Sequence, residues 1–117
     1  MAHTDFRTGL QNAREIEITV TGRSSGRSLS YLVWFALDGD KLYLIPSRGL
    51  DTEWYKNLRK TPTLRLEARG KTLTASARLL TDQAQLDKVL GKFRDKYGRN
   101  VKSYYPKYDV AVEVPLA

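Results

Sequence analysis

Residues 15–37 read EIEITVTGRSSGRSLSYLVWFAL and contain two predicted strands with the loop that joins them. In residues 15–21, isoleucine and valine alternate with glutamate and threonine, a pattern typical of a half-buried strand. Residues 29–37 are a nearly continuous apolar run rich in aromatic and β-branched side chains, which predicts a central strand buried on both faces. This segment therefore indicates a fold in which strands follow one another as hairpins.

The loop Thr21-Gly22-Arg23-Ser24-Ser25-Gly26-Arg27 joins these two strands. Its glycines allow the backbone to approach a ligand closely, and its N–H, hydroxyl and guanidinium groups can all donate to phosphate oxygens. The loop is therefore a candidate phosphate site for a flavin-like cofactor. The same residues also fit a polar hairpin turn whose arginines are solvated, and the loop alone does not separate the two interpretations.

Turn signals at Asp38-Gly39-Asp40 and Arg69-Gly70 predict two further hairpins. The remaining strands are expected over 41–45, 64–67, 71–80 and 110–114. Six strands in hairpin succession predict mostly antiparallel pairing and a mainly β fold. A six-stranded antiparallel β-barrel with peripheral helices is the economical arrangement, because closure leaves no bare edge.

Two helices are expected between the strands. The first begins near residue 51 and ends at Lys60. The second covers residues 82–97 and carries one apolar stripe, with Asp82 as its N-cap and Gly98 just past its end. This second helix is expected to cover the sheet rather than to bind a ligand.

The chain has 117 residues, and we expect one domain over residues 1–117, with 1–13 as a short or flexible N-terminal segment. Its 20 Lys and Arg residues against 13 Asp and Glu residues give a formal net charge of +7, which attracts anions. The basic residues are spread along the chain, which favours local anion sites over a nucleic-acid-binding tail.

Cysteine is absent and His3 is the single histidine, so no Cys or His metal centre and no Ser-His-Asp triad is expected. No apolar stretch approaches the ~18 residues of a membrane span, and no signal-peptide core is evident. We therefore expect a cytoplasmic protein without a membrane span.

Three motifs follow one another along residues 15–80. They are Thr21-Gly22-Arg23-x-Ser25-Gly26, then Trp34-Phe35-x-x-Asp38-Gly39-Asp40-x-Leu42-Tyr43-Leu44 running to Ser47-Arg48-Gly49, and Trp54-Tyr55-x-Asn57-Leu58-x-x-x-Pro62. In this order and spacing they resemble the deazaflavin-dependent nitroreductase family, split β-barrel flavoproteins related to pyridoxamine-phosphate oxidases. The resemblance implies a six-stranded split β-barrel of the FMN-binding type.

The resemblance also implies coenzyme F-420, a 5-deazaflavin with a phospholactyl-oligoglutamate tail. Its reduced form would pass a hydride to a quinone, nitroaromatic or enone-type acceptor. By position in the motifs, the implied cofactor-binding residues are Arg23, Ser24, Ser25, Gly26, Arg27, Ser47, Arg48, Gly49, Trp54, Tyr55 and Asn57. The implied donors to the acceptor are Tyr104, Tyr105 and Tyr108, which could instead be amphipathic tyrosines that close the barrel.

Other functions share this fold class. One alternative is an FMN-dependent reductase or oxidase, and another is a non-catalytic cofactor- or nucleic-acid-binding barrel. Nucleic acid is not the expected partner, because Trp34 and Phe35 lie in a run that should be buried, whereas a stacking platform needs exposed rings. The expected partners are a small-molecule redox substrate and a second copy of the chain as a homodimer.

Overall fold

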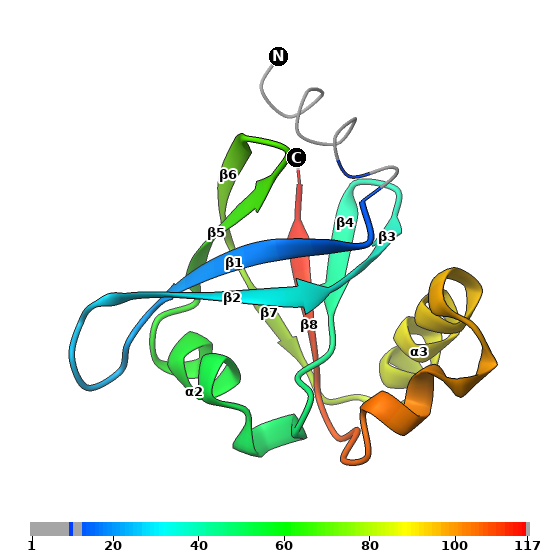
Figure 1. Ribbon diagram of the computed structural model, residues 1–117. Helices are drawn as coiled ribbons and strands as arrows, with labels where there is room; N and C mark the ends of the chain where they lie inside the picture. Colours follow the sequence, from blue (N-terminus) through cyan, green and yellow to red (C-terminus); the bar gives the residue numbers. More distant parts are fainter. Residues whose placement is uncertain (1–9, 11–12, 117) are drawn as a thin grey trace.

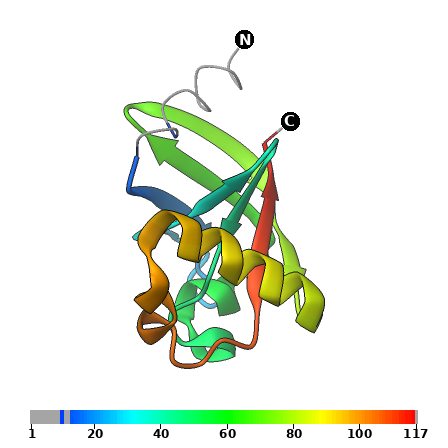
Figure 2. The same ribbon diagram turned by 90° about the vertical axis from the view of Figure 1, so that its right-hand side faces the viewer.

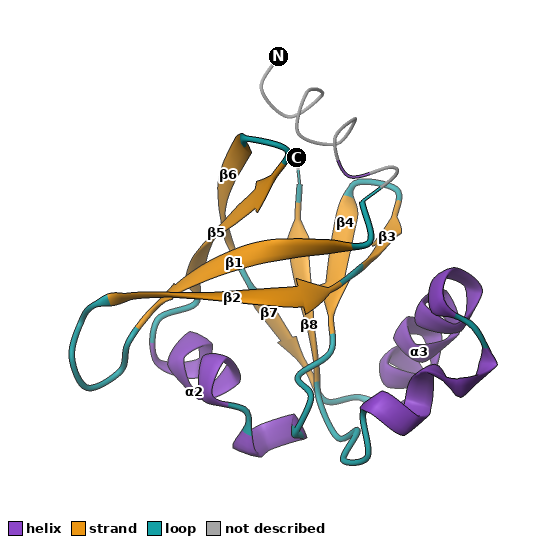
Figure 3. Cartoon of the chain, in the orientation of Figure 1, coloured by secondary structure: helices purple, strands orange, loops and turns teal. Residues whose placement is uncertain are grey.

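The computed structural model describes residue 10 and residues 13–116. Most of the expected N-terminal segment, His3 included, lies outside the described residues. The described part forms two four-stranded antiparallel sheets, with orders β2-β1-β5-β6 and β3-β4-β8-β7, and helices packed around them (Figures 1 and 3). The strands are β1 Glu15–Thr21, β2 Ser28–Trp34, β3 Ala36–Asp38, β4 Lys41–Leu44, β5 Thr63–Ala68, β6 Lys71–Ser76, β7 Arg78–Leu80 and β8 Ala111–Pro115.

The helices are α2 Glu53–Lys60 and α3 Gln83–Tyr97, with 3₁₀ helices at Gly49–Asp51 and Arg99–Tyr104. As predicted, the Asp82 side chain caps α3 by accepting from the Gln85 N–H at 3.1 Å. Gly98 ends the helix with φ 104, a conformation that favours glycine. No helix in the described part of the chain is both long and apolar enough to cross a membrane.

Two long strands change sheets partway along their length. Phe35 separates β2 from β3 and Ala77 separates β6 from β7, so each segment pairs in a different sheet from its continuation. At the breaks the backbone finds other partners: the Phe35 N–H donates to the Tyr97 hydroxyl at 3.1 Å, and the Ala77 N–H donates to the Pro62 carbonyl at 2.8 Å. The six expected strand segments are thus present, two of them divided. Antiparallel, mainly β architecture is confirmed, whereas closure into a six-stranded barrel is not.

The expectation that residues 29–37 are buried on both faces is wrong for β2. This strand lies at the edge of its sheet, and within the described residues it pairs only with β1. Its alternate residues are exposed, and the Leu32 side chain is 66% accessible. An apolar run alone does not distinguish a buried central strand from an edge strand that lines a pocket. β2 is an edge strand of this kind.

The β3-β4-β8-β7 sheet is the central layer of the molecule. On one face Leu44 and Val112 pack in a core shared with the other sheet and α2. On the opposite face Tyr43 and Ala111 pack against Phe93 of α3, which lies across this sheet in Figure 2. Because both faces are covered, β8 is buried over four consecutive residues. Within the described residues β2 is not buried in this way, and its Ser28, Ser30 and Leu32 are exposed.

Candidate functional site

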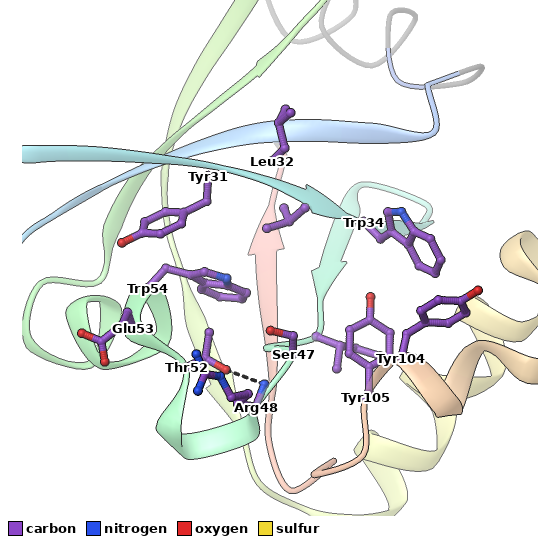
Figure 4. A pocket seen from close by; sticks show the side chains of 12 residues that line it. Tyr31, Leu32, Trp34, Ser47, Arg48, Thr52, Glu53, Trp54, Tyr104 and Tyr105 are labelled. Carbon is purple, nitrogen blue, oxygen red and sulfur yellow. Dashed lines mark hydrogen bonds between the residues drawn. The ribbon is translucent and has the colours of Figure 1, made fainter.

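A pocket of about 420 Å³ lies between β2, the segment after β4 and the second 3₁₀ helix (Figure 4). This volume is in the range of small-molecule and cofactor sites. Its lining combines apolar and aromatic side chains with a few polar groups. The lining residues are Tyr31, Leu32, Val33, Trp34, Ile45, Ser47, Arg48, Thr52, Glu53, Trp54, Tyr104 and Tyr105.

Aromatic side chains form two opposing walls. Figure 4 shows Tyr31 and Trp54 on one side of the pocket, and Trp34, Tyr104 and Tyr105 on the other. The Trp34 ring centroid lies 5.0 Å from that of Tyr104 and 6.5 Å from that of Tyr105, in tilted and edge-on contacts. Aromatic walls of this kind suit a planar conjugated ring, which can stack or pack edge-on against them.

The polar side of the pocket is built where β4 ends and α2 begins. Pro46 follows the strand, and the exposed Ser47 and Arg48 come next. The Arg48 N–H donates to the Thr52 hydroxyl at 2.8 Å, which fixes the turn (Figure 4). Thr52 therefore does not cap α2 with its side chain, and the positive end of the helix dipole faces the same region as the Arg48 guanidinium. The arrangement favours an anionic group here.

Gly49 does not line the pocket, but it allows the turn that carries Arg48 to pack closely against Asp109. Its φ is +55, and a Cβ at this position would lie 2.1 Å from Asp109 Oδ1. The same carboxylate accepts from the Leu50 N–H at 3.2 Å, and Lys107 pairs with Asp51. Lys107 also holds the pKa of the Asp51 carboxyl below its usual value. These contacts join the turn that carries Arg48 to the segment that follows the two tyrosines.

The three candidate tyrosines occupy different environments. The Tyr105 hydroxyl points toward β2 in Figure 4, and within the described residues no group hydrogen-bonds to it. Burial raises the pKa of Tyr105 above its ordinary value of 10.0, so the phenol stays protonated at neutral pH. Tyr104 is 62% exposed and directs its hydroxyl away from the pocket. The Tyr108 hydroxyl donates to the Leu86 carbonyl of α3 and does not line the pocket.

The glycine loop after β1 hydrogen-bonds largely to itself. The Gly22 N–H donates to the Arg27 carbonyl at 2.7 Å, the Gly26 N–H to the Gly22 carbonyl at 2.9 Å, and the Arg27 N–H to Ser25 Oγ at 3.1 Å. Ser24, Ser25, Gly26 and Arg27 are exposed and lie outside the aromatic pocket. Three of the N–H groups that were expected to donate to a phosphate, those of Gly22, Gly26 and Arg27, are thus used within the turn.

Arg23 connects this loop to α2. Its backbone N–H and its guanidinium both donate to Asn57 Oδ1, at 3.0 and 2.8 Å, and the guanidinium also reaches Glu53 Oε1 at 3.1 Å. Arg23 lowers the pKa of the Glu53 carboxyl. Asn57 and Tyr55 are each 2% exposed, so both are internal. Because Glu53 also lines the aromatic pocket, Arg23 lies next to that pocket's rim.

A second hollow of about 450 Å³ lies near Glu53, because two of the residues that line it, Arg23 and Lys56, pair with this carboxylate. Its lining is entirely basic, and we call it the cationic cluster: Arg23, Lys56, Arg59 and Lys60. Lys60 Nζ donates to the Arg23 carbonyl at 2.7 Å and Lys56 pairs with Glu53 at 3.6 Å. Concentrated positive charge beside the aromatic pocket favours a ligand with a ring and an acidic extension.

The pocket thus unites Ser47, Arg48, Trp54, Tyr104 and Tyr105 from the predicted site. Sequence reasoning missed the rest of the lining: Tyr31, Leu32, Val33, Trp34, Ile45, Thr52 and Glu53. One signal in the sequence could have shown that β2 is not buried on both faces. By the two-residue period of a strand, Ser28 and Ser30 share a face with Leu32, and two serines indicate that this face is exposed. In the described part of the chain no three His, Cys, Asp or Glu side chains form a possible metal site.

The fold has solved counterparts. An F420-H2 dependent reductase (FDR-A) superposes with a TM-score of 0.69 at 20% identity, covering 86% of this chain and 93% of that one. A protein solved as a domain-swapped dimer gives a TM-score of 0.71 at 21% identity, over 90% and 82% of the two chains. A candidate pyridoxamine 5′-phosphate oxidase from Listeria innocua gives 0.68 at 14% identity, over 97% and 92%.

At these identities the likenesses show the fold alone, which this chain shares with the three solved structures. The family follows from the sequence: residues 3–116 match the model of the F420H(2)-dependent quinone reductase family. The chain belongs to this family and is an oxidoreductase, an F-420-dependent reductase. The resemblance noted from the three sequence motifs is therefore confirmed.

Replacing Asn57 with alanine tests whether the glycine loop is held as a structural turn. The half-buried Arg23 N–H would lose its acceptor, so we expect the free energy of unfolding to fall by about 1–3 kcal/mol in urea titrations. Ser24→Ala, at an exposed position of the same loop, should change it by less than ~0.5 kcal/mol. Equal effects of the two substitutions would contradict this role of Asn57.

Proposed function

We propose that the aromatic pocket binds the ring of reduced coenzyme F-420 and that the enzyme reduces a quinone, nitroaromatic or enone-type acceptor beside it. One observation carries this proposal: aromatic walls, the exposed Arg48, and a tyrosine hydroxyl that has no partner among the described residues all line the same pocket. When bound, the reduced deazaflavin supplies a hydride. The chain's own residues supply orientation, an apolar environment and a hydrogen-bond donor.

The residues present fit such a cofactor. Trp54 and Trp34, on opposite walls, are placed to contact a planar ring, and Ser47 and Arg48 lie where a phosphate could accept from a hydroxyl, a guanidinium and the N-terminus of α2. We assign the acidic tail to the cationic cluster, which begins at Arg23 beside the pocket. In this assignment the exposed residues 24–27 flank the tail and do not enclose the phosphate.

Among the candidate tyrosines we assign the acceptor contact to Tyr105. Its hydroxyl faces the pocket and has no hydrogen-bond partner among the described residues, whereas the Tyr108 hydroxyl donates to the Leu86 carbonyl. A donor aimed at the acceptor oxygen stabilises the negative charge that develops there as the hydride arrives, and solvent supplies the remaining proton. Val33 and the ring of Tyr104 line the same pocket and suit an apolar acceptor.

FMN is the second candidate cofactor, because the candidate pyridoxamine 5′-phosphate oxidase shares this fold. FMN carries a phosphate but no oligoglutamate tail, so it would leave the cationic cluster unused, which favours F-420. We further propose that residues 1–117 act as one domain in the cytoplasm and that the chain forms a homodimer. The similarity to a protein solved as a domain-swapped dimer supports the last point.

Replacing Arg48 with alanine should weaken F-420 binding by roughly ten- to hundredfold, because a charge-assisted contact contributes about 1.5–3 kcal/mol. Arg27→Ala removes the same charge at an exposed position outside the pocket and should change the affinity much less. Fluorescence titration of each variant with F-420 and with FMN measures both effects. Equal losses in the two variants would place the phosphate elsewhere, and tighter binding of FMN than of F-420 would favour the second candidate.

Replacing Tyr105 with phenylalanine removes only the hydroxyl. We expect kcat for a water-soluble quinone to fall by roughly 10²-fold, as for the loss of one oriented donor, with little change in the Kd for F-420. Because its pKa is raised, ionisation of Tyr105 should not reduce activity below pH 10.0. Tyr43→Phe, which removes a hydroxyl bonded to Glu113 on the α3 side of the sheet, is the matched control. An unchanged kcat in Tyr105→Phe would exclude this role.

Replacing Arg59 with alanine tests the assignment of the tail. We expect F-420 to bind about two- to fivefold more weakly, in line with one exposed charge contact, while a deazaflavin without the glutamate tail binds as before. Arg94→Ala, on α3, makes the same change in net charge and is the control. The difference should shrink as salt rises. An equal loss of affinity for the deazaflavins with and without the tail would show that the cationic cluster does not bind the tail.

A further inference from the structure

Trp34 forms part of one wall of the aromatic pocket, but its position depends on a residue outside that pocket. It is the last residue of β2, directly before the strand break at Phe35. Its indole stacks on the ring of Tyr97, with centroids 4.3 Å apart and an interplanar angle of 7°. Tyr97 is the last residue of α3 and is absent from the pocket lining. A parallel stack of this kind fixes the plane of the indole from behind.

The hydroxyl of Tyr97 acts on the backbone beside the same tryptophan. It accepts from the Phe35 N–H at 3.1 Å and lies within hydrogen-bond distance of two carbonyls, Phe35 at 3.0 Å and Arg14 at 2.6 Å. In the described part of the chain, Phe35 has no partner in the strand register on either side of the break. Tyr97 therefore satisfies backbone groups that the sheets leave unpaired, and it fixes the direction in which Trp34 leaves β2.

Two cations add to this arrangement. The Arg14 guanidinium carbon lies 5.4 Å from the ring centroids of both Trp34 and Tyr97, and Lys96 Nζ lies 3.3 Å from the centroid of Phe35 while donating to its carbonyl at 3.1 Å. Such contacts hold aromatic rings in place. Together these contacts restrain the backbone at Phe35 and the ring of Trp34 beside it.

We propose that Tyr97 is a positioning residue of the active site, which holds Trp34 as a fixed wall for the cofactor ring. The inference rests on the proposed function for the identity of that ring. Tyr97 does not line the pocket. It influences the pocket through its contacts with the Trp34 indole and with the Phe35 backbone. A ring-binding wall that is ordered before the ligand arrives lowers the entropy lost on binding.

The two tryptophans of the chain allow this role to be measured without any ligand. Protein containing 5-fluorotryptophan should give two fluorine resonances, assigned with Trp54→Phe. Tyr97→Phe, which keeps the ring but loses the hydroxyl, should shift the Trp34 resonance, and Tyr97→Leu, which also loses the stack, should shift and broaden it further. The Trp54 resonance should not move. Tyr43→Phe, a loss of one buried hydroxyl elsewhere, should leave both resonances in place.

Ligand binding provides the second readout. Tyr97→Phe should weaken F-420 binding by roughly three- to tenfold, the effect of one hydrogen bond, while Tyr43→Phe binds as the wild type does. An unmoved Trp34 resonance in Tyr97→Phe, or equal affinity losses in the Tyr97 and Tyr43 variants, would overturn the positioning role. A wild-type protein that binds no deazaflavin would instead overturn the proposed function, and the Trp34 resonance would still decide the role of Tyr97.

Discussion

At Phe35, one long strand leaves the sheet of β1 and enters the sheet of β4. Among residues 13–116 neither sheet pairs with this residue, and the Tyr97 hydroxyl accepts from its N–H in place of a ladder partner. Before this point β2 is an edge strand, and after it β3 belongs to the sheet that is covered on both faces. Since β2 lines the aromatic pocket up to Trp34, the last residue of β2 in the pocket lies directly before the change of sheet.

Two connections join the elements that carry the walls of the pocket. Gly49 lets the turn after β4 approach Asp109, which follows the tyrosine-bearing 3₁₀ helix, and no larger residue fits there. On the other side, Asn57 binds Arg23 and joins α2 to the loop after β1. Both contacts use residues from the sequence motifs, yet neither places its residue in the pocket lining. Gly49 and Asn57 thus shape the surroundings of the pocket without lining it.

Ion pairs with acidic residues partly neutralise the positive charge of the chain at two places. On α3, Lys88 and Lys92 are paired with Asp38 at 3.5 Å, so this basic helix face is partly neutralised. Around α2, Glu53 partly neutralises Arg23 and Lys56, and Arg59 adds further positive charge beside the pocket. One carboxylate pairs with two cations in each place, so the further cations of the cationic cluster, Arg59 and Lys60, supply the additional positive field near the aromatic walls.

The sequence by itself determined the strand segments, both long helices, the α3 caps and the family, because these follow from hydrophobic period, turn chemistry and local motifs. It also identified Arg48, Trp54 and Tyr105, which lie in the pocket.

The tertiary structure alone decided which side of β2 is covered, where the two long strands break, and that the glycine loop hydrogen-bonds to itself. It also brought Trp34 and Tyr97, 63 positions apart in the sequence, into one stack. The physical reason is that local patterns specify whether a residue is apolar and which way its strand faces. What lies opposite that face depends on residues distant in the chain.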